Sequence, residues 1–152
     1  MKKVNREKIV VVVSGGFDPL HVGHVRLFKH AKELGDKLVV ILNNDNWLKK
    51  KKKHIFMPEN ERAEIIEALE MVDEVVLTDH KENASDISIS LTLLKVRPDI
   101  FANGGDRKID NIPEIEACRE IDCEVVFNIG RDGKSQSSSW LLGDYLKKHN
   151  NG

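Results

Sequence analysis

The chain has 152 residues, of which 40% are hydrophobic and 32% charged, and this composition is typical of one soluble globular domain. Its 24 Lys and Arg against 25 Asp and Glu leave a net charge of −1, which gives no electrostatic reason to expect a nucleic-acid partner. No apolar run is long enough to span a membrane, residues 1–8 lack the apolar core of a signal peptide, and Cys118 and Cys123 predict free thiols, so we expect a cytoplasmic protein without a membrane partner.

Five short β-branched segments predict five strands. They are residues 8–14, 37–43, 74–78, 99–103 and 123–129. Their nearly continuous apolar character is typical of parallel strands that are covered by helices on both faces.

Segments with helical periodicity alternate with these strands. The predicted helices cover residues 22–34, 57–72, 85–98, 112–121 and 137–149. In the second helix, Ile65, Ile66 and Leu69 are expected to form the buried face. This alternation predicts an α/β fold with a Rossmann-like, doubly wound parallel sheet of five strands. We expect a single domain over residues 1–152 with its core at about 8–149, and ligands at the carboxyl ends of the strands.

The junction between the first strand and the first helix holds an unusual group of residues. Gly15 and Gly16 stand where the strand ends, and glycine there lets a ligand approach the backbone closely. His21 and His24 begin the helix three residues apart, so both rings lie on one face at its positively polarised N-terminus, and Gly23 between them leaves room for a bulky group. This pattern indicates a phosphate site with two additional donors. The alternatives are a plain glycine turn with structural histidines, or half of a zinc site, whose usual spacing differs.

The stretch "GGFDPLHVGH" (15–24) resembles the signature of the cytidylyltransferase-like nucleotidyltransferases, G-x-F-D-x-x-H-x-G-H, at six defined positions. Residues 34–45, 72–77, 103–107 and 136–139 resemble further blocks of this family, which includes glycerol-3-phosphate cytidylyltransferases and ADP-heptose synthases. The resemblance implies transfer of CMP from CTP, or of AMP from ATP, to a small phosphorylated alcohol or sugar phosphate, with release of pyrophosphate. Because the second pKa of such an acceptor phosphate is about 6, the reaction needs no general base.

The resemblance also implies roles for individual residues. His21, His24, Lys53 and Arg62 are the expected catalytic residues, which would bind and bridge the phosphates. The expected nucleotide-binding residues are Gly15, Gly16, Phe17, Asp18, His21, Gly23, His24, Lys51, Gly105, Asp106, Arg131, Ser137 and Ser138. Asp18 is also expected to shape the turn as a hydrogen-bond acceptor.

Two of these assignments have plain alternatives. Lys51 and Lys53 belong to a run of five lysines, which we expect to form a loop and which could be no more than a solvated charge run. Arg62 lies in the first turn of a predicted helix, where a cation is electrostatically unfavourable, and this misfit indicates a bound anion. The alternative is an exposed pair with Glu59 or Glu61.

The resemblance further implies a magnesium ion held mainly by the triphosphate, with Asp106 as a candidate ligand, and a homodimer. Two other functions stay open. A non-catalytic nucleotide-binding or sensor protein could have the same fold. The stretch "GRDGKS" (130–135) also resembles the P-loop of a kinase or NTPase, but the first glycine of that motif would fall on Asn128.

Overall fold

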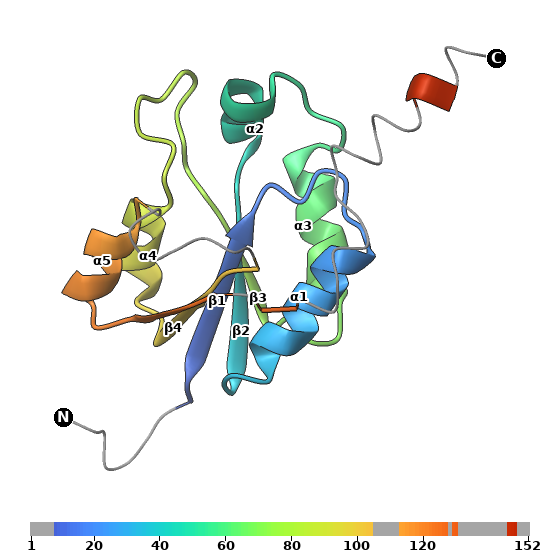
Figure 1. Ribbon diagram of the computed structural model, residues 1–152. Helices are drawn as coiled ribbons and strands as arrows, with labels where there is room; N and C mark the ends of the chain where they lie inside the picture. Colours follow the sequence, from blue (N-terminus) through green and yellow to red (C-terminus); the bar gives the residue numbers. More distant parts are fainter. Residues whose placement is uncertain (1–7, 105–112, 128, 131–145, 149–152) are drawn as a thin grey trace.

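The computed structural model describes residues 8–104, 113–127, 129–130 and 146–148, and Figure 1 shows how its elements are arranged. A five-stranded sheet has the order β3-β2-β1-β4-β5, and every neighbouring pair of strands is parallel. The strands are β1 (Val10–Gly15), β2 (Lys37–Leu42), β3 (Glu74–Leu77), β4 (Ile100–Ala102) and β5 (Glu124–Val126). The predicted fold class is therefore confirmed.

Helices cover both faces of this sheet. They are α1 (Val22–Lys32), α2 (Asp45–Lys52), α3 (Glu59–Glu67), α4 (Ser90–Val96) and α5 (Ile115–Glu120). In Figure 1, α1 and α3 lie on one face and α4 and α5 on the other, while α2 stands beyond the carboxyl ends of the strands. No helix of the described residues is long and apolar enough to cross a membrane.

Alternate residues of the central strands pack into two separate cores. Val11 and Val13 of β1 contact the cluster under α1 and α3, whereas Val12 between them belongs to the cluster under α4 and α5. Both side-chain directions are apolar because both faces are covered, which explains why these strands have no polar alternation. The second cluster also contains Cys118 and Cys123, which are buried free thiols.

The structure corrects two local predictions, and a third falls outside the described residues. Helix α3 is shorter than the helix predicted at 57–72. Ile65 is 43% exposed, because Ile66 faces the sheet together with Ala63 and Leu69, three positions from it on either side. The lysine run forms the end of helix α2 instead of a loop. The helix predicted at 137–149 lies outside the described residues except for 146–148.

The order of the strands determines where a ligand can bind. β1 pairs with β2 on one side and with β4 on the other, so the chain runs outward from β1 in both directions. Open α/β sheets bind ligands at such a switch point, beyond the carboxyl ends of the strands. The residues that follow β1, β2, β3 and β4 are therefore the ones that can form a site.

Candidate active site

The two glycines after β1 allow neighbouring side chains to pack closely. A Cβ atom on Gly15 would lie 2.9 Å from the ring of Phe17, and one on Gly16 would lie 3.0 Å from Leu48 and 3.1 Å from Trp47. Contacts this short are not found with a real Cβ, or force the neighbour to move. Glycine at both positions therefore lets the loop after β1 fold back on itself while α2 packs against the end of the strand.

The side chain of Phe17 packs against one of the two histidines. The Phe17 side chain is only 6% exposed and meets His24 and Phe28 edge-to-face, with ring centroids 4.8 and 5.1 Å apart. The structure buries this side chain in the core, where it contacts the ring of His24 from one side. The resemblance implied that Phe17 binds the nucleotide, and this stays a prediction.

His21 and His24 cap the start of α1. The Nδ1 atom of His21 accepts a hydrogen bond from the backbone N–H of Gly23 at 3.0 Å, and Nδ1 of His24 accepts one from the backbone N–H of His21 at 3.2 Å. This is the reciprocal capping box that Ser or Thr and Glu usually form. Because each Nδ1 accepts a hydrogen bond, the hydrogen of each neutral ring must lie on Nε2. The two rings stack with their centroids 3.8 Å apart.

Both rings are held in the neutral form. Burial lowers the pKa of His21, and burial together with the charge of His21 lowers the pKa of His24 from 6.5 to about 3. A proton on Nδ1 would also remove the acceptor that caps the helix. At pH 7 the N-terminus of α1 therefore carries two neutral, fixed Nε2–H donors directly after the end of β1.

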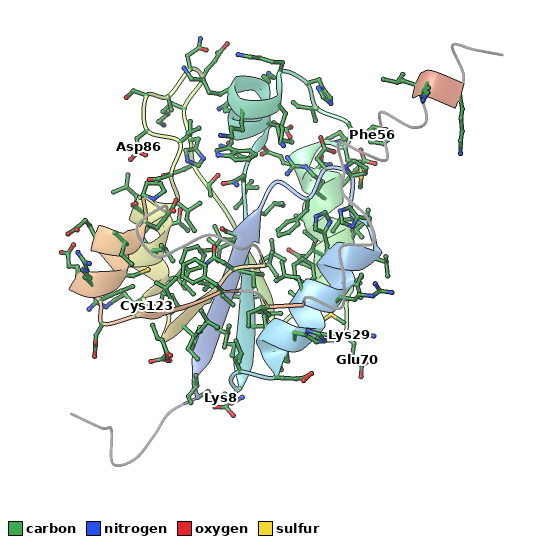
Figure 2. All side chains as sticks on the ribbon, in the orientation of Figure 1. Lys8, Lys29, Phe56, Glu70, Asp86 and Cys123 are labelled. Atoms are coloured by element: carbon green, nitrogen blue, oxygen red, sulfur yellow. The ribbon has the colours of Figure 1, made fainter. Side chains whose placement is uncertain are left out.

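Asp18 fastens this loop to the segment before α3. Its two carboxylate oxygens accept the backbone N–H groups of Phe56, at 2.7 Å, and Met57, at 2.6 Å. Figure 2 shows Phe56 at the end of the molecule where α2 stands, opposite the end that carries Lys8. The predicted role as an acceptor is confirmed, but Asp18 ties two segments together instead of shaping its own turn.

Arg62 is completely buried, and all of its nitrogens are engaged. Nε donates to the carbonyl of Met57 at 2.8 Å, and Nη1 donates to the carbonyls of Gly16 and Asn43 at 2.7 and 2.8 Å. Nη2 forms an ion pair with Asp45 at 2.7 Å. The guanidinium thus joins the ends of β1 and β2 to the start of α2. Loss of Asp45 would leave the buried guanidinium without its counter-charge, which is strongly destabilising.

The alternative that Arg62 forms an exposed pair with Glu59 or Glu61 is wrong, because its side chain is buried and its ionic partner is Asp45. Its predicted contact with phosphates stays a prediction. Four of its five N–H groups donate inside the protein, and only the second N–H of Nη2 has no acceptor among the described residues. Its charge is needed inside the protein, where it satisfies carbonyl groups that would otherwise be buried without donors.

The lysine run supplies unpaired positive charge at the same edge of the sheet. Lys49 to Lys52 form the last turn of α2, and Lys53 ends the helix in a left-handed conformation with φ of 71°. All five side chains are exposed, and no carboxylate of the described residues pairs with them. The predicted contacts of Lys51 and Lys53 with phosphates are compatible with this exposure and stay predictions.

Five predicted site residues lie outside the described residues: Gly105, Asp106, Arg131, Ser137 and Ser138. Gly130, the residue before Arg131, is described by the structure. It has φ of +76°, and a Cβ there would lie 2.7 Å from the backbone of Leu27 in α1. Only glycine fits this position, so the chain passes directly against the helix that carries the histidines.

Sequence reasoning missed the polar residues that follow β2, β3 and β4. Asn44 caps α2 by accepting the backbone N–H of Trp47 at 3.0 Å, and its own backbone N–H donates to Thr78 at 3.0 Å. Asn43 and Asn103 each keep one buried side-chain atom without a partner among the described residues. The available signal was their position, since Asn43, Thr78 and Asn103 are each the last residue of a predicted strand and Asn44 follows the first of these strands directly.

The chain is similar to known proteins over most of its length. A family model described as cytidylyltransferase-like matches residues 12–140. The FAD synthase of Pyrococcus abyssi is 42% identical over 120 residues, 78% of this chain and 77% of that protein, and the FAD synthase of Thermococcus sibiricus is 45% identical over 127 residues, 80% of each. A crystal structure of the lipopolysaccharide core biosynthesis protein from Thermoplasma volcanium superposes with a TM-score of 0.64 at 31% identity, over 80% of this chain and 96% of that one.

The low pKa of His24 predicts a loss of stability in acid. The unfolded chain takes up a proton near the ordinary pKa of 6.5, whereas the folded chain resists it until about pH 3, so the contribution of His24 falls as the pH drops through this range. The loss is at most about 1.4 kcal/mol per pH unit. Thermal unfolding of the wild type and of His24→Asn between pH 7.5 and 4.5 measures it. We expect the wild type to lose stability more steeply, and parallel curves would contradict the assignment.

Proposed function

The chain belongs to the cytidylyltransferase-like family and is a nucleotidyltransferase, and from this premise we propose that it transfers AMP from ATP to FMN, which yields FAD and pyrophosphate. The choice of substrates rests on the relatives named FAD synthase, because FAD is FMN joined to AMP. This acceptor differs from the small phosphorylated alcohol or sugar that the sequence predicted. FMN is itself a phosphate monoester, so the chemistry of attack stays the same.

The observation that carries the proposal is the pair of neutral Nε2–H donors at the start of α1. In the reaction, an oxygen of the FMN phosphate attacks the α-phosphorus of ATP, a new P–O bond forms, and the bond to the leaving pyrophosphate breaks. The acceptor is already a dianion, so the protein must align two anions and stabilise charge on the reacting phosphoryl group. Donors fixed before the reaction do this without reorganisation.

His21 and His24 are suited to this task because their orientation is set by the backbone. Each ring is anchored through Nδ1 to an N–H group of the helix start, which leaves Nε2–H on the other side of the ring. We assign these two donors to the oxygens of the α- and β-phosphates of ATP. We assign Arg62 a structural part in this step, because four of its five N–H groups donate inside the protein.

Lys51 and Lys53 are the proposed contacts to the outer phosphates and to the phosphate of FMN. They are exposed, and α2 stands beyond the same edge of the sheet that carries the histidines. Magnesium would arrive with ATP, held mainly by phosphate oxygens. No group of three His, Cys, Asp or Glu side chains in the described parts of the chain could hold a metal ion by itself. Asp106 and the homodimer stay predictions.

A substrate panel tests the proposed reaction. Pyrophosphate release is measured with ATP or CTP against FMN, glycerol 3-phosphate and a sugar 1-phosphate, and the flavin product is identified by chromatography. We expect ATP with FMN to give FAD and pyrophosphate in equal amounts, and chelation of magnesium to stop the reaction. Nucleotide binding without pyrophosphate release would instead indicate a sensor protein, and release of ADP a kinase.

Paired substitutions at the histidines separate their two roles. Asn places a polar atom near the position of Nδ1 and keeps the cap, whereas Gln places an amide N–H near Nε2 and keeps the donor. We expect His21→Asn and His24→Asn to fold normally but to lose about 10²–10³ in turnover, the usual effect of losing one such donor.

The Gln variants provide the matched control for this experiment. They should keep more activity while losing about 1 kcal/mol of stability, because the helix cap is gone. The assignment of either histidine is wrong if its Asn variant turns over within a few-fold of the wild type.

A further inference from the structure

Helix α2 cannot keep its position by its own stability. It has eight residues, of which only Leu48 is buried, and its last four are consecutive lysines that repel one another. Isolated helices of this length are marginal in water, so contacts with other elements must hold it. On one side, Asp45 forms the ion pair with Arg62, and the backbone N–H of Asp45 donates to the carboxylate of Glu59 at 2.8 Å.

The contacts from the other side come from the loop that joins β3 to α4, residues 78–89. The side-chain amides of Asn44 and Asn46 both donate to the carbonyl of His80, at 2.9 and 2.8 Å. The indole N–H of Trp47 donates to the carbonyl of Ile87 at 2.9 Å. Three side chains of α2 and its cap thus reach two carbonyls of this loop, which stands beside α2 in Figure 1.

The ring of His80 links the two parts of the loop that carry the carbonyls of His80 and Ile87. Its Nε2 lies 2.9 Å from the carbonyl of Ser88, which can only accept, so Nε2 carries the hydrogen. Its Nδ1 therefore accepts from the hydroxyl of Thr78, 2.9 Å away, and that hydroxyl in turn accepts the backbone N–H of Asn44. One imidazole thus connects both ends of the loop to each other and to the cap of α2.

The loop is also fixed on the side away from α2. The backbone N–H of Ile89 donates to the carboxylate of Glu114, a buried side chain at the start of α5, at 3.1 Å. Asp86 accepts the backbone N–H of Ser88 at 2.9 Å, and Figure 2 places Asp86 at the same end of the molecule as Phe56. The loop therefore contacts both α5 and α2.

We propose that residues 78–89 form a brace that holds the lysines of α2 over the reacting phosphates, and that His80 is its positioning residue. The role in the reaction rests on the proposed function, because it assumes that Lys51 and Lys53 contact phosphates. His80 itself touches no substrate. It acts through Asn44, Asn46 and Trp47 on the orientation of the helix.

Two variants test the brace from its two sides. Asn46→Ala removes one amide bond to the His80 carbonyl and raises the helix propensity of α2, so a loss cannot come from weaker intrinsic helicity. His80→Ala removes the ring that closes the loop. Lys95→Ala is the matched control, because it breaks only the exposed ion pair with Asp79 on the same loop. Circular dichroism verifies that each variant is folded.

The first readout is hydrogen exchange of residues 45–53, which does not depend on the reaction. We expect faster exchange in Asn46→Ala and His80→Ala and wild-type exchange in Lys95→Ala. Unchanged protection of α2 in His80→Ala would overturn the brace, whatever the substrates of the enzyme prove to be. If the wild type makes no FAD, the proposed function fails while this readout still decides the brace.

The second readout is kcat/KM for ATP and FMN, measured in the wild type and in a background with Lys51→Gln and Lys53→Gln. Loss of one or two uncharged hydrogen bonds should lower kcat/KM about three- to tenfold. If His80 acts through the lysines, His80→Ala should have almost no further effect in the lysine-free background. Equal losses in both backgrounds would show a general structural role and overturn the positioning.

Discussion

The buried guanidinium of Arg62 is the interaction on which the site depends. Three segments meet at the carboxyl edge of the sheet, and each presents a group that has no donor within its own element: the carbonyls of Gly16 and Asn43 and the carboxylate of Asp45. One planar cation with several fixed N–H groups can satisfy all of them at once. The loop with the histidines and the helix with the lysines therefore share one anchor, and their relative position is fixed before any substrate binds.

The histidines show how this anchored loop becomes chemically useful. A Ser or Thr cap would satisfy the helix start equally well, but it would place only a short hydroxyl at the N-terminus of α1. An imidazole has two nitrogens on opposite sides of the ring, so it can cap the helix with one and present a donor with the other. Burial against Phe17 keeps the ring of His24 neutral and fixes its orientation. A neutral donor can bind an anionic substrate over a wide pH range.

The sequence was sufficient for the strands, because five buried parallel strands have no polar alternation to obscure them, and for the position of the histidines, because the glycines and the helix start frame them. It could not assign Arg62, since nothing near residue 62 in the sequence indicates that Gly16, Asn43 and Asp45 converge there. It misplaced Ile65 because one apolar residue beside Ile66 looks equally buried until the sheet fixes the rotation of α3. The helix of the lysine run was missed because contacts from α3 and from residues 78–89 stabilise it, and its own residues do not.

The central claim is that the site presents two neutral imidazoles whose hydrogens lie on Nε2. Nitrogen-15 NMR of the histidine rings in the free protein measures this directly, because protonated and unprotonated ring nitrogens differ strongly in chemical shift. We expect His21 and His24 to show a protonated Nε2 and an unprotonated Nδ1 at pH 7, and His24 to keep this pattern down to pH 5. Hydrogen on Nδ1 in either ring, or a doubly protonated His24 at pH 7, would contradict the account.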